Sequence, residues 1–107
     1  MGQQSKTIII GPLTIDKMRK LVQLESRSIH LTPIELALLC ALAACPGRVH
    51  RREELLHQVW GEDINVEVRT VDAHMSKLRH KLQTTDDSLS LAETVWGIGY
   101  RLRDPSS

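Results

Sequence analysis

Residues 66–82, VEVRTVDAHMSKLRHKL, sort their apolar and basic side chains onto opposite faces of one helix. At about 100° per residue, Val71, Met75, Leu78 and Leu82 fall within one narrow stripe, which is typical of a seam packed on a core. The opposite face consists of Arg69, Thr70, Ala73, Ser76, Lys77 and His80. Such a face of donors with one methyl group suits the major groove of DNA, although most amphipathic helices are simply packed on one side and solvated on the other.

The charge of the chain is unevenly distributed, although its net value is only +1. Residues 69–82 carry four bases against Asp72, a local charge of +3, whereas residues 83–107 carry two arginines against four acids, a local charge of −2. The 107 residues, of which 41% are hydrophobic, suffice for one domain with a single core. A basic face on a nearly neutral body favours sequence-selective DNA binding over general coating of nucleic acid.

No apolar run reaches the ~20 residues that span a bilayer, and the opening MGQQSK lacks the apolar core of a secretory signal. We therefore expect a cytoplasmic protein, and no motif indicates a cofactor. Cys40 and Cys45 lie among leucines in a helical pattern, five positions apart. Because they point in different directions, a free, buried pair of thiols is favoured over a disulfide or a metal site.

The first part of the chain is rich in short β-type runs. Runs at 7–10, 13–15, 20–24 and 28–31, separated by Gly11-Pro12, Asp16-Lys17 and Glu25-Ser26, predict a small antiparallel sheet of four strands.

A helical region follows. Thr32, Pro33 and Glu35 form a capping box that starts a helix ending at Cys45-Pro46-Gly47. Its expected core face consists of Leu36, Leu39, Cys40 and Ala43. A second helix is expected at about 52–59, with Leu55, Leu56 and Val59 inward. With the polar loop at 61–65 and the basic helix, it predicts a helix-turn-helix variant that has a long turn.

The last region has the alternating residue pattern of two β-strands that form a hairpin. Residues 93–96 and 100–103 flank a Gly97-Ile98-Gly99 turn. With Trp96 near its tip, the hairpin is either a wing that reaches an adjacent groove or backbone, or an element that merely closes the core.

Four motifs, taken in order, carry a resemblance to a known family. They are Leu31-Thr32-Pro33-Ile34-Glu35 with Leu38-Leu39; Arg52-Glu53-Glu54-Leu55-Leu56 with Val59-Trp60-Gly61; Arg69-Thr70-Val71-Asp72-Ala73-His74 with Leu78-Arg79 and Lys81-Leu82; and Thr94-Val95-Trp96-Gly97-Ile98-Gly99-Tyr100-Arg101. With these spacings the chain resembles the DNA-binding effector domain of OmpR/PhoB response regulators over nearly all its length.

This resemblance implies an α+β fold, a winged helix-turn-helix with an N-terminal four-stranded antiparallel sheet, three helices and a C-terminal β-hairpin wing. The winged-helix DNA-binding domain then covers residues 7–103, between a flexible tail at 1–6 and a C-terminal tail at 104–107. Its function would be sequence-specific binding of double-stranded DNA for transcription regulation, as the output domain of a two-component response regulator.

The resemblance also implies roles for individual residues. Base-edge contacts fall to Thr70, Asp72, Ser76 and Lys77. Contacts to the phosphate backbone fall to Trp60, Arg69, His74, Arg79, Thr94 and Tyr100, to which we add Lys81 of the basic helix, and the wing presents Trp96 and Arg101. His74 could equally form part of the core edge, and Asp72 could orient Arg69 instead of reading a base.

Three departures from the family pattern bear on specificity. Several relatives carry two consecutive basic residues where this chain has Ser76-Lys77, so one strong guanine-reading option is missing. Trp96 stands where many relatives place an arginine in the minor groove, and an indole can supply only packing, a single NH donor or a sugar contact. Arg51 replaces a frequent serine cap, so the second helix should start less firmly, by ~1 kcal/mol, and Arg51 is free to meet a phosphate.

The resemblance further implies partners. The loop at 61–66 corresponds to a segment that contacts RNA polymerase in the family, and its acids Glu62 and Asp63 either meet a basic polymerase surface or are ordinary solvated charges. We expect a monomer when isolated, a head-to-tail dimer on direct-repeat DNA, and a receiver domain in the full-length protein.

Two other function classes are less well supported by the sequence. An enzyme would need a site, yet the only close histidines, His74 and His80, are six positions apart on different faces of the helix, and the chain has no phosphate loop or nucleophile motif. A winged helix used only for protein contacts would show an acidic or apolar outer face, whereas the face from Arg69 to Lys81 is basic and polar.

Overall fold

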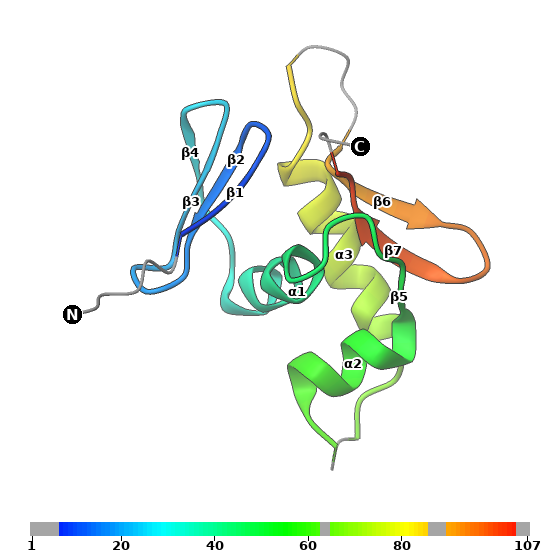
Figure 1. Ribbon diagram of the computed structural model, residues 1–107. Helices are drawn as coiled ribbons and strands as arrows, with labels where there is room; N and C mark the ends of the chain where they lie inside the picture. The colour runs from blue at the N-terminus through cyan, green and yellow to red at the C-terminus, as the bar shows by residue number, and fades with distance from the viewer. Residues whose placement is uncertain (1–6, 63–64, 86–89, 105–107) are drawn as a thin grey trace.

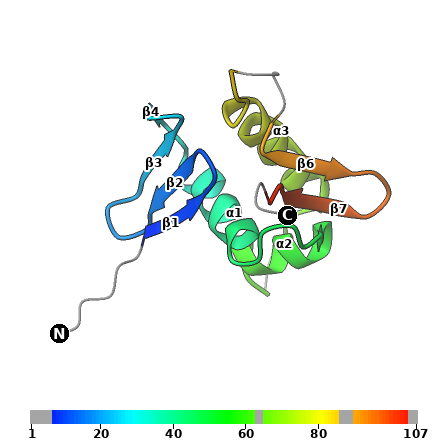
Figure 2. The ribbon, with the colours of Figure 1, turned by 45° about the horizontal axis from the view of Figure 1, so that its top comes forward.

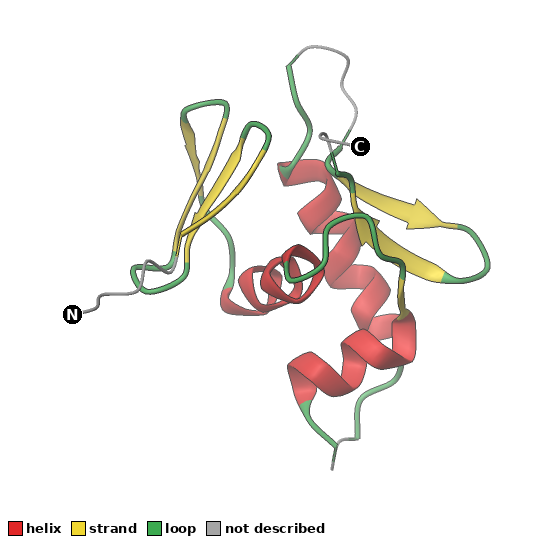
Figure 3. Cartoon of the chain, in the orientation of Figure 1, coloured by secondary structure: helices red, strands yellow, loops and turns green. Residues whose placement is uncertain are grey.

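The computed structural model of this protein describes residues 7–62, 65–85 and 90–104 (Figure 1). Within them a four-stranded sheet comes first, three helices follow and a hairpin comes last, which confirms the predicted winged helix-turn-helix architecture. Figures 2 and 3 show the N-terminal sheet and the hairpin on opposite sides of α1. The tail expected at 1–6 and residues 105–107 of the C-terminal tail lie outside the described residues.

The N-terminal sheet follows the predicted strand runs closely. Its antiparallel strands, in spatial order, are β1 (Thr7–Ile10), β2 (Leu13–Asp16), β3 (Leu21–Leu24) and β4 (Arg27–Ile29). Cross-strand pairing places Ile15 opposite Ile8 and Val22, so one face of the sheet is a continuous apolar surface that faces the core. Glu25 and Ser26 both have positive φ (54° and 67°), which gives the two-residue β3–β4 turn the twist that a tight hairpin requires.

Helix α1 (Pro33–Ala43) begins at the predicted capping box. The Thr32 hydroxyl accepts from the Glu35 backbone N–H at 3.1 Å, and the Glu35 carboxylate accepts from the Thr32 backbone N–H at 3.0 Å. The predicted core face is wrong in part, because Leu38, Leu39 and Leu42 are the fully buried leucines. Leu36 and Cys40 are only partly buried. An almost wholly apolar helix has no periodicity from which the inward stripe could be read.

The two cysteines are free, as expected, but they are not a buried pair. Cys40 is partly buried on α1, and Cys45 is exposed because the helix ends before it, at Ala43. Burial raises the pKa of the Cys40 thiol, which therefore stays protonated at neutral pH.

Helix α2 (Arg52–Trp60) and helix α3 (Arg69–Lys81) pack on α1 (Figure 1). The predicted seam of α3 is confirmed, because Val71, Met75, Leu78 and Leu82 are all 0% exposed. On α2, Leu55 and Leu56 are buried as expected, while Val59 is only partly buried. These side chains join those of α1 and the inner face of the sheet in one apolar cluster.

The C-terminal hairpin pairs with a strand that the sequence did not reveal. Strands β6 (Ala92–Val95) and β7 (Gly99–Leu102) form the hairpin, and β5 (His50–Arg51) pairs with β7 on its other edge. Two residues are too short to show a strand period, so β5 could not be predicted. Gly99, expected in the turn, instead lies in β7, where it pairs with Arg51 of β5. The two strands approach so closely there that a Cβ on residue 99 would lie 1.9 Å from the carbonyl oxygen of His50, so only glycine fits.

None of the helices in the described parts of the chain is both long and apolar enough to cross a membrane.

Replacing Gly99 with alanine should lower the free energy of unfolding by about 2–3 kcal/mol, because the added methyl group meets the β5 backbone, which cannot move aside like a side chain. Gly97→Ala is the matched control: its φ is +82° but a Cβ there meets no atom within 4 Å, so only backbone strain of about 1 kcal/mol is expected. Urea denaturation measures both. Equal losses would mean that the close approach of β5 to β7 is absent in solution.

Candidate nucleic-acid interface

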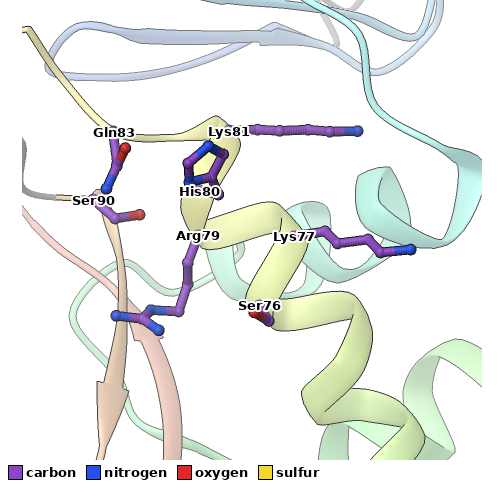
Figure 4. Close-up of a pocket in the computed structure, with 7 residues that line it drawn as sticks. All are labelled: Ser76, Lys77, Arg79, His80, Lys81, Gln83 and Ser90. Atoms are coloured by element: carbon purple, nitrogen blue, oxygen red, sulfur yellow. The ribbon is translucent and has the colours of Figure 1, made fainter.

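The outer face of α3 carries the side chains that the sequence singled out. Ser76, Lys77, Arg79 and His80 are all exposed, and Thr70 is partly exposed. Figure 4 shows Lys77 and Arg79 extending to opposite sides of the helix, with Ser76 between them. Among the described residues neither Lys77 nor Arg79 forms an ion pair, so both charges are available to an anionic ligand.

Asp72 connects this helix to the elements on both sides of it. Its Oδ1 accepts from Arg52 Nε at 3.0 Å and from the Tyr100 hydroxyl at 2.7 Å, and a second guanidinium nitrogen of Arg52 bonds to Oδ2. This paired contact of Arg52 is the bidentate geometry that orients a carboxylate firmly. Asp72 therefore ties the first turn of α3 to the start of α2 and to β7.

The electrostatics of Asp72 and Tyr100 follow from these contacts. Burial by itself would raise the pKa of Asp72, but hydrogen bonds from Arg52 and Tyr100, with the charge of Arg52, hold that pKa below its ordinary value. Desolvation, together with the hydrogen bond to Asp72, raises the pKa of Tyr100 to about 12. Asp72 is thus an anion and Tyr100 a neutral donor at physiological pH.

Sequence reasoning missed Arg52 and assigned Asp72 a different neighbour. The partner of Arg69 is Glu67, at 2.8 Å, and not Asp72. Arg52 lies twenty residues before Asp72 in the chain, so no local spacing rule links them.

Lys81 also has a partner that the sequence did not indicate. Its Nζ lies 2.6 Å from Oε1 of Glu35, whose side chain is only 1% exposed. Burial by itself would raise the pKa of Glu35, but hydrogen bonds to its carboxylate from Lys81 and Thr32, with the charge of Lys81, hold that pKa below its ordinary value. Lys81 thus neutralises a buried charge on α1, whereas Arg79, two positions earlier on α3, is exposed and has no ion pair among the described residues.

The rings of Trp60, at the end of α2, and His74, on α3, are in contact. Their ring centroids lie 5.6 Å apart with a tilt of 54° between the planes, and both side chains are partly exposed. This ring contact fits a structural role of His74 at the edge of the core, and its partly exposed side chain is equally accessible to a ligand, so both interpretations remain.

The two faces of the hairpin differ in chemistry. Thr94 lies opposite Tyr100 on the face toward α3, whereas Glu93 lies opposite Arg101 on the other face. Arg101 Nε is 2.9 Å from one oxygen of Glu93, and Arg103 Nε is 3.4 Å from the other. The arginine predicted to serve the wing is thus paired and lies on the face away from α3.

A hollow joins the outer face of α3 to the hairpin. Its lining consists of Arg52, Asp72, Arg79, and residues 94–100. At the hairpin tip Trp96 is 88% exposed and Ile98 is 53% exposed. The helix and the hairpin tip therefore border one continuous surface.

The start of α2 and the loop after it complete the candidate interface. Arg51 makes no side-chain cap, as its chemistry predicts, but the Glu54 carboxylate accepts from the Arg51 backbone N–H at 3.1 Å and so supplies half of a capping box. Glu62 is exposed in the loop, and Asp63 lies outside the described residues.

Among the residues described, no group of three or more histidine, cysteine or acidic side chains could hold a metal ion.

The sequence of this chain is similar to those of known transcriptional regulators. Residues 26–102 match the family described as "Transcriptional regulatory protein, C terminal". The transcriptional regulatory protein SrrA of Staphylococcus aureus is 38% identical over 96 residues, which cover 89% of this chain and 40% of SrrA. The chain thus spans well under half the length of the curated relatives it matches.

Solved structures of similar sequence share the fold. The DNA-binding domain of Klebsiella pneumoniae RstA, solved in complex with the RstA box, is 31% identical with a TM-score of 0.79, over 92% of this chain and 98% of that one. DrrB, a Thermotoga maritima OmpR/PhoB homologue, is also 31% identical with a TM-score of 0.78, over 91% of this chain and 44% of that one.

Replacing Asp72 with asparagine should destabilise the protein most at neutral pH. Because the pKa of Asp72 in the folded state is lowered, its ionised form stabilises the fold above the ordinary pKa, and this contribution is lost as the pH falls through the lowered value. The difference in unfolding free energy between wild type and Asp72→Asn should therefore shrink on acidification, as urea titrations at several pH values would show. Glu53→Gln, at an exposed carboxylate of α2, is the control, and a pH-independent difference for Asp72 would refute the assignment.

Replacing Lys81 with alanine should lower the free energy of unfolding by about 1–3 kcal/mol, because Glu35 is left buried without its cation. Lys77→Ala removes an exposed lysine of the same helix and should change stability by less than about 0.5 kcal/mol. Thermal and urea denaturation measure both. If Lys81 contacts phosphate instead, its variant would keep full stability and lose about one unit of the salt dependence of DNA binding.

Proposed function

Since the chain belongs to the family of C-terminal domains of transcriptional regulatory proteins, of the OmpR/PhoB type, we propose that it binds double-stranded DNA in a sequence-specific manner by placing α3 in the major groove. DNA binding for transcription regulation is the function of this family. The observation that carries the proposal is that Lys77 and Arg79 are exposed on α3 and form no ion pair with any residue that the structure describes. Most other arginines near this face are held by carboxylates.

We assign base reading to the outer face of α3, from its first turn to its middle. Thr70, Ser76 and Lys77 offer hydroxyl and ammonium groups to base edges, and Lys77 can donate to the O6 and N7 acceptors of guanine. For Asp72 a positioning role accounts for more of the geometry, because Arg52 and Tyr100 already occupy both of its oxygens. A contact from Asp72 to cytosine would have to compete with these donors.

Backbone contacts fall to residues at the borders of the same surface. Arg79 extends sideways from α3 (Figure 4), and Thr94 borders the hollow between α3 and the wing. Side chains placed at the flanks of a groove-bound helix meet the phosphates on either side of that groove. The remaining members of the proposed backbone set are Trp60, Arg69, His74, Tyr100 and Lys81, of which Lys81 is paired with Glu35.

The proposed context is that of a response regulator. We propose that the whole protein, in the cytoplasm, carries a receiver domain beside this one, and that two copies bind direct repeats head to tail while the isolated domain is a monomer. The exposed acid Glu62, with Asp63 beside it in sequence, is proposed to meet RNA polymerase.

Selection from a random duplex pool, followed by salt titration of the enriched duplex, tests the division of roles. Lys77→Ala should cost about 1–3 kcal/mol on the enriched duplex and relax base choice at one position. Arg79→Ala should weaken enriched and random duplexes alike and reduce the slope of log K against log salt by about one. Lys17→Ala and Arg19→Ala are matched controls, because both residues are exposed on the β2–β3 turn, beyond α1 from the wing (Figure 2).

Two results would contradict this function. If no sequence is enriched and binding stays weak at every salt concentration, sequence-specific binding by this chain is wrong. If Lys77→Ala and Arg79→Ala lower the affinity for enriched and random duplexes by the same factor, the assignment of base reading to Lys77 is wrong.

A further inference from the structure

His50 is a buried histidine for which the proposed function has no role. It lies on β5, which precedes α2 and pairs with β7 (Figure 1), and only 3% of it is exposed. Its Nδ1 lies 3.0 Å from a guanidinium nitrogen of Arg48. Because a guanidinium group only donates hydrogen bonds, Nδ1 accepts, and the proton of the neutral imidazole is on Nε2. Nε2 is buried without a hydrogen-bond partner among the described residues, so the fold holds one neutral tautomer.

Arg48 links His50 to the first turn of α2. A second guanidinium nitrogen of Arg48 lies 2.6 Å from Oε2 of Glu54, whose Oε1 accepts from the Arg51 backbone N–H at 3.1 Å. This last contact is the half of a capping box with which α2 begins. Hydrogen bonds from Arg48 and Arg51, with the charge of Arg48, lower the pKa of Glu54, which is therefore ionised at neutral pH. His50, Arg48 and Glu54 are called the His50 cluster below.

The surroundings of His50 disfavour a positive charge on its ring. Burial, followed by the charge of Arg48, lowers the pKa of His50, and the opposing charge of Glu54 does not make up for these two effects. On β7, Tyr100 lies opposite His50, and its neutral hydroxyl is bonded to Asp72. His50 is thus neutral at physiological pH.

Other charged groups on the elements around β5 have partners or lie in solvent, as far as the structure describes them. They are Arg52, bound to Asp72; Arg101 and Arg103, bound to Glu93; and Arg51, Glu53 and His57, which are exposed. Asp104, after β7, lies beside Gly47.

We propose that the His50 cluster is a pH switch, which fixes the hairpin and α2 while His50 is neutral and releases them when His50 takes up a proton. A proton on Nδ1 would face the N–H groups of Arg48 across the same 3.0 Å, so the hydrogen bond is lost and two cations repel each other inside the fold. His50 then reaches water only by leaving its place opposite Tyr100. Because Tyr100 donates to Asp72, which also binds Arg52, the disturbance extends to the first turn of α3.

The switch has one effect on the fold and one on the ligand. A folded state in which the pKa of His50 is lowered binds fewer protons than the unfolded chain, so the fold loses stability as the pH falls below the ordinary value of 6.5. The effect on DNA affinity rests on the proposed function, because it requires that α3 and the wing form the binding surface.

Histidine NMR tests the switch in the folded wild type. The ring resonances of His50 should titrate with a midpoint below 6.5, and the backbone amides of β5 and β7 should shift at the same midpoint. Amides of the N-terminal sheet, on the other side of α1 from the hairpin (Figure 2), should not shift with them. Arg48→Gln keeps a donor for Nδ1 but removes the charge, so this variant should raise the midpoint.

Affinity for the enriched duplex tests the consequence for DNA binding. His50→Asn offers Arg48 an amide oxygen but cannot titrate, and His57→Asn, at an exposed histidine of α2, is the matched control. From about pH 7.5 to one unit below the NMR midpoint, the affinity of the wild type relative to His50→Asn should fall by about fivefold or more. The affinity relative to His57→Asn should stay constant. His74 and His80 gain charge in all three proteins, so these ratios cancel their effect.

Distinct results overturn distinct statements. If the His50 ring does not titrate before the domain unfolds, or titrates without a shift of the β7 amides, the switch is wrong. A shift of the sheet amides at the same midpoint, or equal ratios for the two variants, overturns it as well. If His50→Asn does not fold, the wild-type titration and Arg48→Gln decide. If the wild type binds no duplex at any pH, the proposed function fails, and the NMR titration still decides whether the switch exists.

Discussion

The burial of one side of α3 is the constraint on which the rest of this structure depends. Val71, Met75, Leu78 and Leu82 are fully enclosed, so the helix can neither rotate nor slide without exposing apolar surface or forcing polar groups inside. The rotational setting of the helix then decides which side chains face outward. A polar face of fixed geometry, presented by a helix that is held along its whole length, is what recognition of a rigid duplex requires.

Ion pairing within the domain decides which charges remain for a ligand. The chain has several cations near the proposed interface, yet Arg52 is held by Asp72, Arg69 by Glu67, and Lys81 by Glu35. Two of these pairs join elements of the fold, because Lys81 with Glu35 connects α3 to α1, and Asp72 connects α3 to α2 through Arg52 and to β7 through Tyr100. Among the described residues of α3 the charges without an ion-pair partner are Lys77 and Arg79, and Arg51 adds an exposed, unpaired charge at the start of α2. A count of basic residues along α3 therefore overstates the charge that phosphates would meet.

The wing has two faces because a β-hairpin alternates its side chains. Tyr100 and Thr94 point toward α3, while Arg101 and Glu93 point away and pair with each other. Close pairing of β5 with β7 at Gly99 fixes the hairpin beside the helices, so its tip is carried outward next to the α3 surface. The division of chemistry between a basic helix and an apolar wing tip follows from these two facts.

The sequence by itself determined the order of the elements, the capping box of α1, the buried seam of α3 and the family, because these depend on short-range periodicity and on motifs with fixed spacing. It did not determine the inward face of α1, the strand β5, or the partners of Asp72, Lys81 and Arg101. An apolar helix carries no phase information, and a two-residue strand has no period. The contacts from Arg52 to Asp72 and from Lys81 to Glu35 join residues twenty and forty-six positions apart. Only the packing of the helices against one another brings such residues within hydrogen-bond distance, and for that reason the tertiary structure decided which charges are free.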